Sequence, residues 1–142
     1  MPHRVGTTGD VFFVHWQSAP IPRELDEILP AVEKRSKELG RKLMYLTVVP
    51  PDAPVPSSVE RKALDAFAAS LKPWVEQAFL VLEGEGFKAS IQRSVVIGLT
   101  FFKERGYTTI CKNVDEAVRK IAAITKGDRT ALLAAVRAGA VG

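Results

Sequence analysis

The chain has 142 residues, enough for one domain with a buried core, and its 46% hydrophobic and 25% charged composition excludes a disordered or disulfide-stapled protein. One cysteine and two histidines exclude a structural zinc cluster, and no apolar run approaches the roughly eighteen residues of a membrane span. The net charge of +4 is dispersed among acids along helical segments, so we expect neither a nucleic-acid partner nor integral membrane contact.

The first part of the chain predicts a β-hairpin followed by a helix. Residues 2–17 contain a glycine-rich turn and then the strongly β-prone stretch VFFVHW. The helix is expected over 18–40, where apolar residues recur every three or four positions up to a glycine stop. Pro30 lies inside this pattern and is expected to kink the helix or delay its start.

The remainder alternates strands with helices. Apolar runs of strand length lie at 42–50, 77–86 and 107–113. Helical patterns lie at 57–74, 87–106, 114–124 and 128–142. The order β-β-α-β-α-β-α-β-α, with an extra C-terminal helix, predicts an α/β fold with a mixed, mostly parallel sheet of four to five strands. We expect one domain over 1–124, with 125–142 as a helical extension of it.

This order resembles the STAS fold of anti-sigma-factor antagonists and their SpoIIAA-like relatives over roughly residues 2–124. The resemblance also rests on the apolar run AFLVLEGEGF at 78–87 and the closing VDEAVRKI at 114–121. It implies a non-catalytic regulatory module that acts by docking on a protein partner. In phospho-regulated STAS proteins, the junction of the third strand and second helix carries an Asp-Ser-Ser/Thr-Gly motif whose serine a partner kinase phosphorylates.

The corresponding junction here reads PPDAPVPSSVE and contains Asp52, Ser57 and Ser58, a possible regulatory loop. Four residues separate Asp52 from Ser57, and no glycine follows the serines, so the spacing departs from the phosphorylated motif. Ser57 and Glu60 have instead the spacing of a capping box, and the prolines favour a stiff, extended connector. A helix cap is therefore favoured over a phosphorylation site.

The expected helix at 87–106 is apolar nearly all round over SVVIGLTFF at 94–102. Such a helix is either deeply buried or covered by a partner. We therefore expect a homodimer or partner interface formed by Val95, Val96, Leu99 and Phe102.

An alternative function is the binding of a small molecule or lipid, because SpoIIAA-like sequences are distantly related in fold to lipid-carrying CRAL-TRIO domains. Its pocket would lie between the sheet and the helices. The aromatic residues expected to line it are Phe67, Trp74, Phe79, Phe87, Phe101 and Phe102.

An enzyme using His15 or Ser57 is disfavoured because no base-and-partner spacing is visible in the sequence. His15 and Trp16 should face opposite sides of the sheet, with Trp16 in the core or an interface and His15 partly buried. Cys111 is expected to be an inert, buried thiol, and EGEGF lacks the lysine of a nucleotide-binding loop. No catalytic residue, cofactor or metal is expected, and the absence of an apolar leader pattern predicts a cytoplasmic protein.

Overall fold

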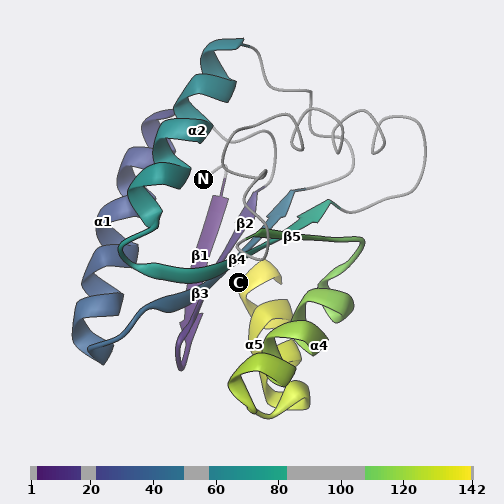
Figure 1. Cartoon of the computed structure of the whole chain (residues 1–142). Helices are drawn as coiled ribbons and strands as arrows, with labels where there is room; N and C mark the ends of the chain where they lie inside the picture. The colour runs from purple at the N-terminus through teal and green to yellow at the C-terminus, as the bar shows by residue number, and fades with distance from the viewer. Residues whose placement is uncertain (1–2, 17–21, 50–57, 83–107, 142) are drawn as a thin grey trace.

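A computed structural model of the chain describes residues 3–16, 22–49, 58–82 and 108–141 (Figure 1). The strands are β1 (His3–Thr8), β2 (Val11–Trp16), β3 (Leu43–Val49), β4 (Val75–Leu82) and β5 (Thr108–Cys111). The helices are α1 (Pro22–Leu39), α2 (Ser58–Leu71), α4 (Val114–Thr125) and α5 (Arg129–Val141).

The strands form one sheet in the spatial order β1-β2-β3-β4-β5. β1 pairs antiparallel with β2, and β2 through β5 run parallel to one another. The expected α/β fold with a mixed, mostly parallel sheet is therefore confirmed. Its outermost strands in the described part of the chain are β1 on one side and β5 on the other.

Helices cover both faces of the sheet (Figure 1). α1 and α2 lie on one face, and α4 and α5 lie on the other. α1 and α2 share a face because each connects neighbouring parallel strands by a crossover of the usual right-handed sense. α4 and α5 follow β5 and lead to no further strand, so this constraint does not apply to them.

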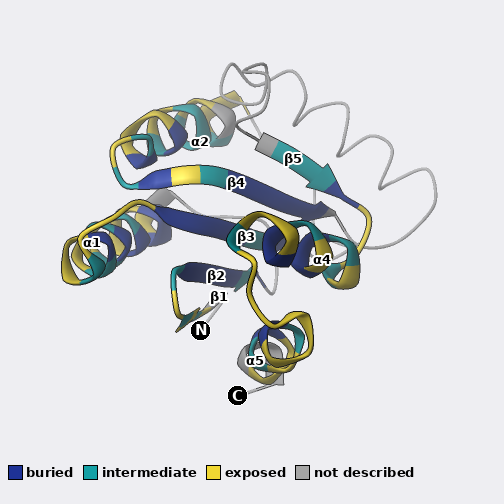
Figure 2. Cartoon of the chain, turned by 60° about the horizontal axis from the view of Figure 1, so that its bottom comes forward, coloured by how far each residue is buried: buried dark blue, intermediate teal, exposed yellow. Residues whose placement is uncertain are grey.

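The face under α1 and α2 is an aromatic and aliphatic core. Figure 2 shows β2 and β3, which supply much of it, coloured mostly as buried. The expected stripe of α1, including Leu25, Ile28 and Val32, is buried there. Phe12 and Tyr45 stack on neighbouring strands with ring centroids 6.2 Å apart, and Phe67 of α2 packs edge-on against Tyr45. Alternate residues of β2 and β3 thus supply this face, as the period of a strand requires.

The opposite face is covered by α4 and α5. Val118 and Ile121 of α4 and Leu132 and Val136 of α5 pack on the sheet there, together with Phe13. α5 is joined to α4 by Arg137, whose Nη2 lies 3.0 and 3.1 Å from the two carboxylate oxygens of Asp115. The C-terminal segment is therefore a regular helix that docks on its own sheet.

Phe13 lies over a glycine of the edge strand. In the β1–β2 register Phe13 pairs with Gly6, and a Cβ atom on Gly6 would lie 2.5 Å from Phe13 Cε2 and closer still to Cζ. Only glycine leaves room for this ring. The absence of a side chain at position 6 thus lets the aromatic ring pack between β1 and the helix layer.

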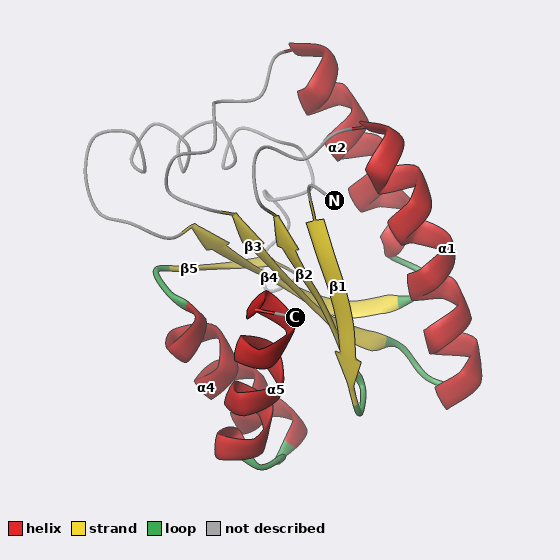
Figure 3. Cartoon of the chain, turned by 180° about the vertical axis from the view of Figure 1, so that it is seen from behind, coloured by secondary structure: helices red, strands yellow, loops and turns green. Residues whose placement is uncertain are grey.

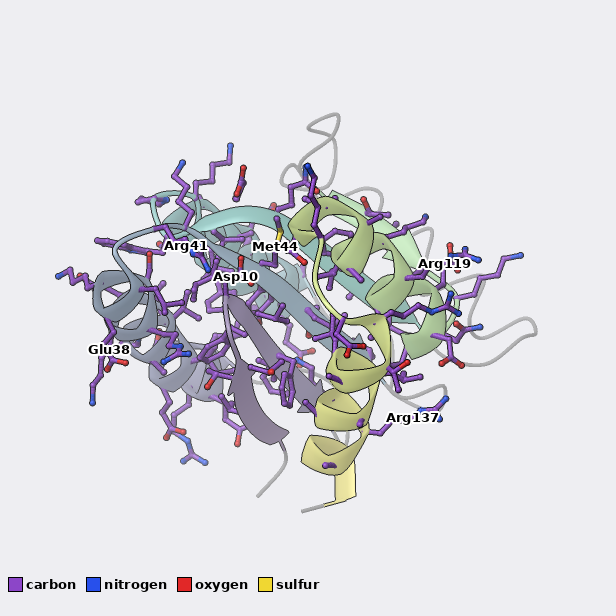
Figure 4. All side chains as sticks on the ribbon, turned by 90° about the horizontal axis from the view of Figure 1, so that it is seen from below. Asp10, Glu38, Arg41, Met44, Arg119 and Arg137 are labelled. Carbon is purple, nitrogen blue, oxygen red and sulfur yellow. The ribbon has the colours of Figure 1, made fainter. Side chains whose placement is uncertain are left out.

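At the end of the sheet where the parallel strands begin, hydrogen bonds and an ion pair join the β1–β2 turn to β3, to α1 and to the turn after α1 (Figure 4). The Met44 N–H donates to the Asp10 carbonyl at 2.8 Å, and Arg41 Nη2 lies 3.7 Å from Asp10 Oδ2. Arg35 Nη2 donates to the Gly9 carbonyl at 2.9 Å. Basic side chains of α1 and of the turn after it therefore hold the hairpin against the helix layer.

Several element bounds differ from those expected. α1 continues through Pro30. The proline has no N–H to donate to the carbonyl of Asp26. Both residues are exposed, so water can donate to that carbonyl instead. α2 ends at Leu71, before Pro73, and β4 begins at Val75 rather than at residue 77. The helix expected at 87–106 lies outside the described residues.

Candidate functional site

Parallel strands carry their ligand sites at the edge where their carboxyl ends meet. In the described part of the chain, this edge is formed by the ends of β2, β3, β4 and β5 and by the start of α4. Its polar groups lie on both faces of the sheet. The two faces are separate environments, because the side chains of neighbouring residues in a strand point to opposite sides.

His15 lies on the face covered by α4 and α5. Its ring packs edge-on against Phe13 with centroids 5.9 Å apart, and its Nε2 lies 2.9 Å from the Val136 carbonyl oxygen. A carbonyl only accepts a hydrogen bond, so Nε2 carries the proton and donates it. The expectation of a partly buried histidine is confirmed, and the imidazole Nε2 is used to hold α5.

Trp16 faces the opposite side, as expected, and is buried under α1. Its indole Nε1–H donates to Thr47 Oγ1 at 3.0 Å. Tyr45, two residues before Thr47 on β3, is also buried; desolvation raises the pKa of its hydroxyl, and the nearby Thr47 hydroxyl lowers it less. The polar ends of these two aromatic residues therefore meet at one partly buried hydroxyl, that of Thr47.

Cys111 ends β5 and is buried, as expected. Burial first, and then the negative charge of Glu116, raise the pKa of its thiol to about 11, against a smaller opposing effect of Lys120 and Arg119. At neutral pH the group is a thiol, and a thiol is a poor nucleophile.

The N-terminus of α4 is capped by its own residues. Asn113 Oδ1 accepts from the Glu116 N–H at 2.8 Å, and Glu116 Oε2 accepts from the Lys112 N–H at 3.0 Å. This backbone hydrogen bond, aided by Lys120, lowers the pKa of the Glu116 carboxyl. The expectations from sequence missed this cap, although Asn followed three residues later by Glu is a readable capping signal.

The predicted interface and loop residues lie almost entirely outside the described residues. This holds for Val95, Val96, Leu99 and Phe102 and for Asp52 and Ser57. Ser58 is described as the exposed first residue of α2.

The aromatic residues expected to line a ligand pocket do not share a face. Phe67 and Trp74 pack on the α1–α2 side of the sheet, whereas Phe79 is buried on the α4–α5 side. The sheet separates them, so these residues cannot line one cavity; β4 turns Phe79 away because its side chains alternate. The remaining members of that set, Phe87, Phe101 and Phe102, lie outside the described residues.

Large exposed apolar side chains are dispersed over the described surface. Val5 on β1, Val59 on α2 and Ile124 on α4 belong to separate elements. Among the described residues, no group of three or more His, Cys, Asp or Glu side chains is placed to hold a metal ion. No described helix combines the length and apolarity needed to cross a bilayer.

The sequence was compared with protein-family models and with curated proteins. Neither comparison gives a match. The resemblance to the STAS fold remains a prediction from element order and from short sequence stretches.

Proposed function

We propose that the protein is a non-catalytic, STAS-like interaction module that acts in regulation by docking on protein surfaces, including a second copy of itself. The observation that carries this proposal is that the described side chains of β2, β3 and β5 that could do chemistry are buried or bonded within the fold. His15 Nε2 binds a helix carbonyl, and the Tyr45 hydroxyl and the Cys111 thiol are buried with raised pKa values. Each of these groups serves the fold in a neutral or bonded form.

The proposed docking surface includes the apolar stretch 94–102. The residues proposed to contact the partner are Val95, Val96, Leu99 and Phe102. The sequence pattern supports this surface, because a helix that is apolar nearly all round is either buried in its own domain or covered by a partner. The separation of Phe67 and Trp74 from Phe79 by the sheet favours protein docking over a ligand pocket lined by all three.

Site-specific photo-cross-linking in the native cell tests the proposal. A photoreactive side chain at position 102 should give a discrete protein adduct, whereas the same group at Arg119, which is exposed on α4, should not. Native mass spectrometry of the purified protein is the second measurement. Absence of an adduct at 102, together with a co-purifying apolar small molecule, would contradict the proposal in favour of ligand binding.

A further inference from the structure

Alternate residues of β1 direct their backbone N–H and C=O groups away from the sheet. The Met44 N–H donates to the Asp10 carbonyl, and β2 pairs with β3 without a break from Val11 onward. Even-numbered residues of β2 therefore direct their backbone groups toward β3, and odd-numbered residues direct theirs toward β1. In the β1–β2 register, Gly6 pairs with Phe13 and Thr8 with Val11, so Val5 and Thr7 direct their N–H and C=O groups outward.

No described element pairs with this outer side. β1 is at the end of the strand order, and Figure 3 looks onto its free edge with no described helix or strand crossing in front of it. The side chains of Val5 and Thr7 are also exposed, and the Val5 side chain is 44% accessible although β-branched and apolar. An unpaired edge of this kind is a template for another strand.

β1 has few of the usual protections of an edge strand. It is six residues long, it pairs with β2 without a bulge, and it contains neither lysine nor proline. Its single arginine, Arg4, is the second residue of the strand and pairs with His15 of β2. β5, the outermost strand on the other side, is only four residues long, which is one way to blunt an edge.

The helix beside this edge leaves it accessible. α5 buries Leu132 and Val136 on the sheet and directs Arg137 toward Asp115 of α4. The helical period places Ala131, Ala135 and Ala138 on the flank away from α4, which is the flank nearest the free edge. The described residues of α5 on that flank are therefore short and uncharged.

We propose that β1 pairs antiparallel with β1 of a second copy, so that two sheets join about a two-fold axis. This proposal rests on the proposed interaction function and names a second copy as the partner. The outward residues Val5 and Thr7 have uncharged side chains. When Val5 of one copy lies opposite Thr7 of the other, Arg4 lies opposite Thr8, so the two arginines do not face each other although the chain carries +4. A two-fold antiparallel pair is self-complementary, because the same outward groups donate and accept on both sides.

The size of the edge predicts a weak dimer. A strand of six residues is about 20 Å long, and strand plus flanking helix layer is about 20 Å wide, so each copy buries roughly 400 Å². The total of about 800 Å² is less than the roughly 1,200 Å² at which stable specific interfaces begin, so the dimer should be weak and transient, and association should depend on concentration over the micromolar range or above.

Residue-resolved amide hydrogen exchange, measured from low micromolar to millimolar concentration, tests the pairing. The Val5 and Thr7 amides should gain protection as concentration rises, about tenfold or more, while those of Gly6 and Thr8 stay protected throughout. Val5→Pro removes one outward N–H and leaves the β1–β2 ladder intact, so it should abolish self-association without changing the urea midpoint. Val5→Thr keeps the N–H and should still associate.

Two results would overturn the pairing. The first is a dimer in which Val5 and Thr7 exchange at the same rate at every concentration, which places the interface elsewhere, with residues 94–102 as the next candidate. The second is a monomer at every concentration. Neither result decides the interaction function, which the cross-linking at position 102 tests independently.

Discussion

The His15 imidazole donates from Nε2 to the carbonyl oxygen of Val136 at 2.9 Å, although the two residues are 121 positions apart in the chain. This bond joins the second strand to the last helix on the face of the sheet that α4 and α5 cover. It gives that face a polar anchor within an otherwise apolar contact formed by Phe13, Leu132 and Val136.

Removing this anchor should destabilise the fold. We expect His15→Ala to lower the free energy of unfolding by about 1–2 kcal/mol, because a partly buried carbonyl loses its donor. Urea denaturation measures the change. Arg137→Met is the matched control on the same helix: it removes an exposed ion pair and should cost no more than about 0.5 kcal/mol. Equal effects of the two variants would show that the histidine contributes no specific bond.

The Gly6–Phe13 contact predicts a coupled pair of substitutions. Gly6→Ala should cost about 1–3 kcal/mol, because the new Cβ overlaps the Phe13 ring and forces it to move. Phe13→Leu in the same chain should recover part of that loss. A double-mutant cycle measures the coupling, and strictly additive effects would contradict the contact.

Lys126 predicts a stabilising change. It ends α4 with φ of 58°, in the left-handed region, where a side chain is unfavourable. Lys126→Gly should raise the free energy of unfolding by about 0.5–1 kcal/mol. Lys126→Ala keeps a Cβ atom and should give no such gain, so a similar rise in thermal midpoint for both variants would argue against backbone strain.

The buried thiol predicts a loss of stability in alkali. The pKa of Cys111 is raised from 9.0 to about 11 in the folded protein, so the unfolded chain loses this proton first as pH rises. The stabilisation is present below about pH 9 and is lost between about pH 9 and 11. The raised pKa of buried Tyr45 adds a further loss above its ordinary value of 10.0.

Urea midpoints across this range measure the effect. Cys111→Ala should flatten the decline between pH 9 and 11 relative to the wild type, whatever its cost at neutral pH. An unchanged slope in Cys111→Ala would mean that the thiol does not titrate differently in the two states.

Most of the sheet follows from local sequence pattern. The apolar run at 43–49 is long enough for a strand and is buried on both faces, and strands alternating with helices leave few topologies. The alternation along β2 likewise predicts that His15 and Trp16 face opposite sides of the sheet. The split of Phe79 from Phe67 and Trp74 could not be foreseen in the same way, because it depends on the register of β4 within the sheet.

The contacts that were not predicted from the sequence are of two kinds. The Asn113–Glu116 cap is local and readable from spacing alone. The bond from His15 to Val136 has no local signal, because its position depends on how α5 docks after the whole sheet has formed. The outward groups of β1 likewise depend on which β2 residues pair with β3, and only the register supplies that.

The most direct test of docking on a second copy is the mass of the purified protein in solution, measured by sedimentation from low micromolar to millimolar concentration. The wild type should rise from the mass of one chain toward twice that value, and Val5→Pro should remain a folded monomer at every concentration. Phe102→Glu, measured beside them, reports whether the stretch 94–102 adds to the same association. A wild type that keeps the mass of one chain at all concentrations would contradict the claim that this protein docks on a second copy of itself.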